Sequence, residues 1–209
     1  MKLVSGIAAL ALAAGLAQGA GPTFTIDFDK DSAGVNIPNG STIANQYLGW
    51  GVKFTPNAYS GGTWATNTDM TATSTDVGGG YTAVHKQVLH SFGGWLNEDN
   101  DPSIRVDFAS PIDSLSVTFI GDFDNLSEVD LFDGSGNFIT FGLVSGSGSD
   151  KVVSFTGLSG LGVVSIGAIL PGWFGDWVGV DDIKFSYVPA PASVGLLGLG
   201  ALVAGRRRR

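Results

Sequence analysis

The segment IRVDFASPIDSLSVTF, residues 104–119, contains two runs in which apolar and polar residues alternate strictly, over residues 104–108 and again over residues 115–119. Successive side chains of an extended strand point to opposite faces, so a period of two places all the apolar residues on one face. The segment therefore predicts two β-strands, each with one face on a hydrophobic core and the other in water.

Similar short runs recur along most of the chain, with Gly, Asn, Asp and Ser between them. They cover residues 24–28, 50–54, 128–132, 138–143, 152–155, 163–169 and 178–187. The sequence DGSGN at residues 133–137 is typical of a hairpin turn. Many short strands without a long helical period predict an all-β domain, a β-sandwich over residues 21–187.

Composition and charge exclude several function classes. The chain has no Cys, so disulfide frameworks and thiolate catalysis are excluded. Five of its 11 basic residues lie at the ends, as Lys2 and Arg206–Arg209, which leaves six basic and 19 acidic residues in between and a net charge of −13 there. Such a domain repels phosphate backbones, so we expect no nucleic-acid partner. An acidic surface suits cations, neutral polysaccharide or solubility alone.

The first 20 residues, MKLVSGIAALALAAGLAQGA, predict a helical signal peptide that signal peptidase removes. Lys2 provides the positive start, residues 3–16 are apolar or small, and Ala17 and Gly19 are small residues at the positions that the peptidase reads. We expect cleavage after Gly19 or Ala20. A buried N-terminal helix is the alternative, but the segment has no polar face.

The last 22 residues, VPAPASVGLLGLGALVAGRRRR, combine a proline motif, an apolar run and an arginine cluster. The run from Ala192 to Gly205 predicts a membrane helix, although a full span needs about 17 to 25 residues. The four arginines, Arg206, Arg207, Arg208 and Arg209, predict a cytoplasmic C-terminus and an external β domain.

This three-part tail at residues 188–209 resembles a PEP-CTERM sorting signal, also labelled an ice-binding-protein C-terminal domain. Val188, Pro189, Ala190 and Pro191 stand where that family has Val-Pro-Glu-Pro, and Ala190 departs from the pattern. The resemblance implies cleavage by an exosortase-type protease after transient residence in the inner membrane of a Gram-negative, exopolysaccharide-producing bacterium. An ordinary membrane anchor is the alternative, but it does not explain the two prolines.

The middle domain resembles, at the level of strand pattern, the jelly-roll domains of carbohydrate-binding modules. In those domains the first and last strands run side by side and share a structural Ca²⁺. The resemblance implies that Asp27 or Asp29 and Asp181 or Asp182 would hold such an ion, since hard cations prefer several oxygen ligands. The alternative is that these four aspartates are solvated strand residues.

Several tryptophans are candidates for sugar binding, because aromatic rings stack on the CH faces of sugars. Trp64 and Trp95 lie in a Gly-rich region, and Trp173 lies in a Gly-bounded aromatic segment. The alternative is that these rings are buried.

The sequence contains no HExxH, GxSxG or P-loop pattern, and its two histidines are five residues apart, a spacing that gives no metal pair on a strand or a helix. We therefore expect a non-enzymatic, exported cell-surface or extracellular-matrix protein. A carbohydrate-binding module that acts on exopolysaccharide is the first alternative, and a secreted hydrolase is the second.

Overall fold

A computed structural model describes residues 21–55, 57–60, 63–66, 71–73, 87–90, 104–120, 127–147, 150–170 and 179–190. This part of the chain consists of β-strands, turns and two single-turn 3-10 helices, and contains no α-helix, which confirms the all-β prediction. The predicted signal helix and membrane helix lie outside the described residues.

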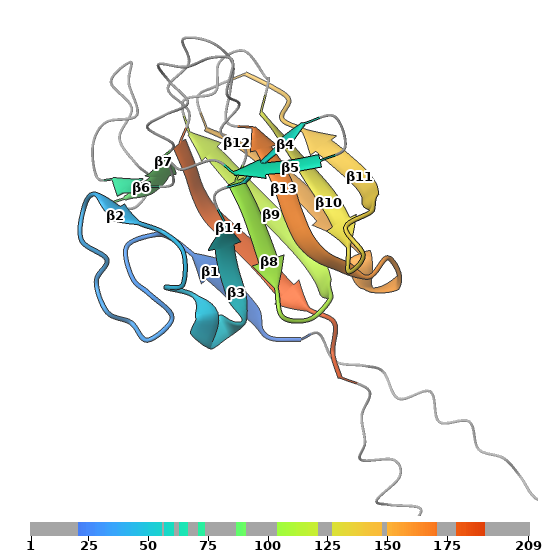
Figure 1. The fold of residues 1–209 in the computed structure, drawn as a ribbon, viewed down its shortest axis with the longest axis horizontal. Helices are drawn as coiled ribbons and strands as arrows, with labels where there is room; N and C mark the ends of the chain where they lie inside the picture. Colours follow the sequence, from blue (N-terminus) through green and yellow to red (C-terminus); the bar gives the residue numbers. More distant parts are fainter. Residues whose placement is uncertain are drawn as a thin grey trace, which may run out of the picture. The chain divides into compact units, whose positions relative to one another are not determined.

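The first sheet is antiparallel throughout and contains both ends of the domain (Figure 1). Its strands are, in order, β12 (Asp150–Thr156), β9 (Ile112–Ile120), β14 (Gly179–Tyr187), β7 (Val88–His90), β6 (Thr71–Thr73) and β2 (Ser41–Thr42). Strand β1 (Thr23–Ile26) also pairs with β14, from Thr23 opposite Ser186 to Ile26 opposite Ile183. The first and last strands of the domain are therefore neighbours.

The second sheet is also antiparallel. Its order is β11 (Phe138–Leu143), β10 (Glu128–Asp133), β13 (Val163–Leu170), β8 (Ile104–Phe108) and β3 (Val52–Thr55). A separate hairpin of β4 (Asn57–Ser60) and β5 (Thr63–Thr66) packs against β8 and β13, and Figure 1 shows it crossing in front of them.

The two alternating runs of residues 104–119 form β8 and β9, which belong to different sheets. One core cluster contains buried residues from both strands: Val106 of β8, and Leu115, Val117 and Phe119 of β9. The chain thus crosses from one sheet to the other between the runs, and both apolar faces meet in the sandwich interior. Burying such residues stabilises the fold by about 1.5–3 kcal/mol for each large apolar side chain.

The predicted hairpin at residues 133–137 is confirmed: it joins β10 to β11. Asp133 Oδ1 accepts hydrogen bonds from the backbone N–H of Ser135 and of Asn137, both at 2.8 Å, and Gly136 adopts the left-handed φ of 80° that favours glycine. Its hydrogen bonds, led by those with Asn137, hold the pKa of the Asp133 carboxyl below its usual value.

The edge strands of the two sheets, β11 and β12, approach closely at Gly142. A Cβ atom at Gly142 would lie 2.7 Å from Val153 Cγ1 and 2.8 Å from Phe155 Cζ, two atoms of β12. Glycine thus permits this edge of the sandwich to close. Residues Gly21–Val188 form one compact unit.

Candidate functional site: an aromatic and acidic sheet face

Three cross-strand pairs between β10 and β11 place six side chains on one face of the second sheet. Alternate β10 residues Val129 and Leu131 point into the core, so their neighbours on the strand face the other way. We call this surface the β10–β11 outer face. Its pairs are Glu128 with Leu143, Asp130 with Phe141, and Phe132 with Phe138.

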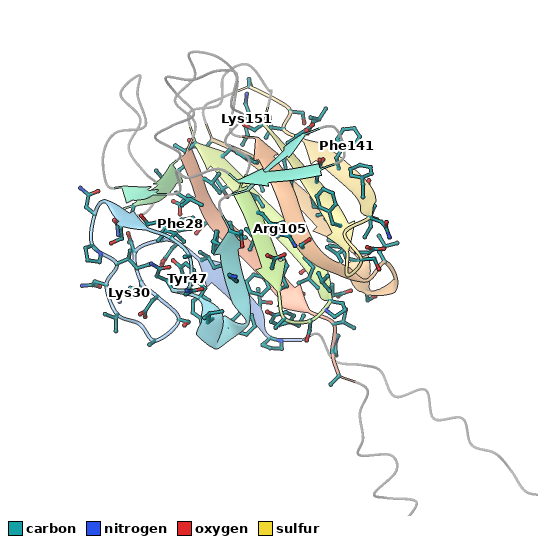
Figure 2. The ribbon with its side chains drawn as sticks, in the orientation of Figure 1. Phe28, Lys30, Tyr47, Arg105, Phe141 and Lys151 are labelled. Carbon is teal, nitrogen blue, oxygen red and sulfur yellow. The ribbon has the colours of Figure 1, made fainter. Side chains whose placement is uncertain are left out.

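The aromatic part of the outer face is a row of three contacting rings, of which Phe132 is buried and Phe138 and Phe141 are open to solvent. Phe132 is fully buried and meets Phe138 edge-on, with ring centroids 6.0 Å apart. The Phe138 and Phe141 rings lie 6.4 Å apart and are 48% and 52% exposed. Leu143 is similarly exposed, and Figure 2 shows Phe141 at the outer side of β11. This face therefore offers rings for a ligand to stack on.

The acidic part of the outer face contains a buried carboxyl group. Asp130 is only 8% exposed, and its side chain forms no hydrogen bond or ion pair with any residue that the structure describes. Its cross-strand neighbours are Phe141 on β11 and Gly167 on β13, neither of which is polar. Burial, together with the negative charge of Glu128, raises the pKa of Asp130 to about 6.

The arginine of the same sheet has an acidic partner of its own. Asp107 lies opposite Ser165, which lies opposite Phe132, so this residue of β8 faces the same way as the outer face. Arg105 Nε donates a hydrogen bond to Asp107 Oδ1 at 2.8 Å (Arg105 is labelled in Figure 2). The guanidinium is thereby held on β8, two strands away from Asp130.

The four predicted calcium ligands lie on adjacent segments, but each strand aspartate has contacts within the protein. Asp181 is fully buried and its Oδ1 accepts the backbone N–H of Asp182 at 2.8 Å. Asp182 Oδ2 forms an ion pair with Lys184 Nζ at 2.8 Å. Asp27 Oδ1 accepts the N–H of Asp29 at 3.1 Å. Within the described ranges, no three acidic or histidine side chains gather as a metal would require.

Two buried polar side chains, Gln87 and Tyr47, which the sequence did not predict, lie near the first of these segments. Gln87 Nε2 donates to the carbonyl oxygens of Phe28 and Ile37, at 3.0 and 2.7 Å, and so holds both ends of the loop after β1. Tyr47 is fully buried against Phe28 (Figure 2). Burial, with the nearby carboxylates of residues 27, 29 and 31, raises the pKa of the Tyr47 hydroxyl.

The calcium ion that Asp27 or Asp29 would share with Asp181 or Asp182 stays a prediction.

The predicted sorting motif begins where the sandwich ends. Val188 N–H donates to the carbonyl oxygen of Pro111 at 2.9 Å, Pro189 is half-buried, and Ala190 is exposed. Trp64 lies on β5 opposite Tyr59, but its side chain is outside the described part. The remaining predicted site residues lie outside the described residues altogether: Pro191, Arg206, Arg207, Arg208, Arg209, Trp95 and Trp173.

The outer face itself was not predicted from the sequence. The run FITFGL at residues 138–143 predicted a strand with one apolar and one polar face, whereas Phe138, Phe141 and Leu143 are exposed. The available signal was an excess of large apolar residues, since four of six positions are Phe, Ile or Leu and one face cannot bury them all.

Comparison with protein families, with curated proteins and with solved structures found no match for this chain. Among the described residues, no helix has the length and apolar character needed to cross a membrane.

Proposed function

We propose that the chain is an exported, non-enzymatic cell-surface or extracellular-matrix protein, sorted by a PEP-CTERM and exosortase system. The observation that carries this proposal is the position of the proline motif. The compact unit ends at Val188, and of the next two residues Pro189 is half-buried and Ala190 is exposed. A protease can reach an extended, exposed segment more readily than a strand. The N-terminal signal peptide would supply export.

The finer fold class that fits this proposal is a jelly roll. Its support is the pairing of the first strand with the last, β1 with β14, inside a two-sheet antiparallel domain. Jelly rolls are double-sheet architectures common in lectin-type domains.

Mass spectrometry of the protein recovered from its native host tests whether both ends of the chain are removed during export. We expect loss of residues 1–19 or 1–20 and loss of the arginine cluster. An exported protein that retains Met1 would contradict the signal peptide, and one that retains Arg206–Arg209 would contradict processing of the tail.

A second function, carbohydrate binding, is favoured by the β10–β11 outer face. Two exposed Phe rings stand beside the carboxylate of Asp130, which has no hydrogen-bond donor among the described residues. Sugars present CH faces that stack on rings and hydroxyl groups that donate to carboxylates. Exopolysaccharide, which the sorting system implies, would be the ligand.

Titration of host exopolysaccharide against the full chain, purified in detergent, tests this second function. Replacement of Phe141 by Ala should weaken binding about tenfold, because it removes the exposed ring. Val152→Ala is the matched control, since Val152 is 56% exposed on β12 of the other sheet. Equal binding by both variants would contradict the proposal.

A further inference from the structure

We propose that the β10–β11 outer face selects sugar polymers that carry protonated amino groups, in which an ammonium group sits between Asp130 and Glu128 while the sugar ring stacks on Phe141. This inference rests on the proposed carbohydrate-binding function and names the class of sugar.

Two carboxyl groups of β10 lie on the same side of the strand. Glu128 and Asp130 are two residues apart on one strand, so their side chains share a face, with Cα atoms about 6.6 Å apart. Two carboxylates at this spacing can both contact one ammonium group, which has three donors. A neutral hydroxyl donates a single hydrogen bond and brings no charge.

The carboxyl group of Asp130 has no cationic partner among the residues that the structure describes. Asp130 is 8% exposed, and its carboxylate oxygens are not among the fully buried atoms that lack a partner, so they keep contact with solvent and can be reached by a ligand. The strands and hairpin around Asp130 bring no cation: residues 134–149, 163–170 and 57–66 contain no charged residue. Arg105 of β8 pairs with Asp107. An incoming ammonium group would therefore supply the partner that the described protein does not.

The charge of the domain and the position of Phe141 both favour a cationic ligand. The segment between the basic ends carries a net charge of −13, which raises the local concentration of cationic polymers. Phe141 stands directly opposite Asp130, so a cation beside this carboxylate also lies beside an aromatic ring. Cation–π attraction adds to the ion pair. A neutral sugar would use the ring but not the pair of charges.

The experiment compares two oligosaccharides of equal length, a glucosamine hexamer and an N-acetylglucosamine hexamer, by titration calorimetry at pH 6.5 with the full chain in detergent. We expect the glucosamine hexamer to bind about tenfold more tightly. Asp130→Asn should remove that preference and leave binding of the acetylated hexamer within about twofold. Phe141→Ala should weaken both. Asp113→Asn on β9 is the charge control and should alter neither.

The pH dependence gives an independent readout. Asp130 becomes protonated below its pKa of about 6, whereas the sugar amine stays charged. The charged groups around it are Glu128 of β10 and the Arg105–Asp107 pair of β8. Glucosamine hexamer binding should therefore fall several-fold from pH 6.5 to 4.5, with a smaller change in Asp130→Asn.

The outcomes separate this inference from the function on which it rests. Equal affinity for the two hexamers, weakened by Phe141→Ala, would overturn the amine preference and leave carbohydrate binding standing. Binding of neither hexamer or of host exopolysaccharide would overturn both. A lysine hexapeptide that binds as tightly as the glucosamine hexamer would overturn a sugar as the occupant.

Discussion

At the scale of single residues, Asp130 links the stability of the fold to pH. Burial, and after it the negative charge of Glu128, raises the pKa of Asp130 from 3.8 to about 6, so between these values the folded state binds more protons than the unfolded state. The free energy of unfolding must therefore decrease as pH rises through this window. Below pH 3.8 both states are protonated, and the group has no net effect.

We expect Asp130→Asn to stabilise the protein at pH 7.5 by about 1–2 kcal/mol relative to its effect at pH 4, because the amide removes the buried charge. Urea denaturation at the two pH values measures the difference. Asp113→Asn is the control on β9. If Asp130→Asn shifts the unfolding free energy equally at both pH values, Asp130 does not titrate as described.

The aspartates after β1 and on β14 allow a test of calcium. If Asp27 or Asp29 and Asp181 or Asp182 share an ion, millimolar Ca²⁺ should raise the melting temperature above that in EDTA. An ion that binds only the folded state stabilises by about 2.7 kcal/mol at a hundredfold excess over Kd. Asp181→Asn should abolish the rise in melting temperature that Ca²⁺ causes, whatever the substitution does to the melting temperature in EDTA. Asp113→Asn should leave that rise unchanged. Identical melting temperatures in Ca²⁺ and in EDTA would contradict the predicted calcium site.

At the scale of elements, the closed edge between β11 and β12 depends on Gly142. Gly142→Ala should destabilise the fold by about 1–3 kcal/mol, since Val153 must move to admit the methyl group. Gly134→Ala is the matched control, because its Cβ would lie 3.6 Å from Val164 Cγ2, an ordinary contact. Thermal unfolding of both variants measures the effect. Equal melting temperatures would show that β12 is not packed tightly on β11.

At the scale of the whole molecule, the proposed sorting role of the tail can be tested by deletion. If the proline motif is the recognition element, deletion of residues 188–191 should leave the protein uncut and membrane-bound. Deletion of Arg206–Arg209 should instead disturb retention, since moving each arginine through the bilayer centre costs about 2.5–3.5 kcal/mol on insertion scales.

Immunoblots of membrane and medium, in hosts with and without the exosortase, distinguish these roles. Only the host with the exosortase should release a shortened protein. The same size and distribution in both hosts would show that the tail is an anchor alone.

The sequence alone predicted the strands β1, β3 and β8–β14 and the turn between β10 and β11, but it did not predict β2 or β4–β7. Alternation over residues 104–108 and 115–119 is a local property, because the period of two needs no knowledge of the partner strand. The Asp133 turn is equally local, since its carboxyl group binds backbone N–H groups two and four residues away. These features were predictable from neighbouring residues.

Only the tertiary structure decided which strands pair and which apolar residues stay exposed. Nothing in the sequence near residue 104 assigns β8 and β9 to opposite sheets, because pairing depends on segments far along the chain. The same holds for Asp130 and Phe141: each lies in a predicted strand, but their common face depends on the register of β10 with β11. The bulge in that pair also places Phe138 beside Phe132. A shift of one residue would reverse the faces, so this register creates the candidate site.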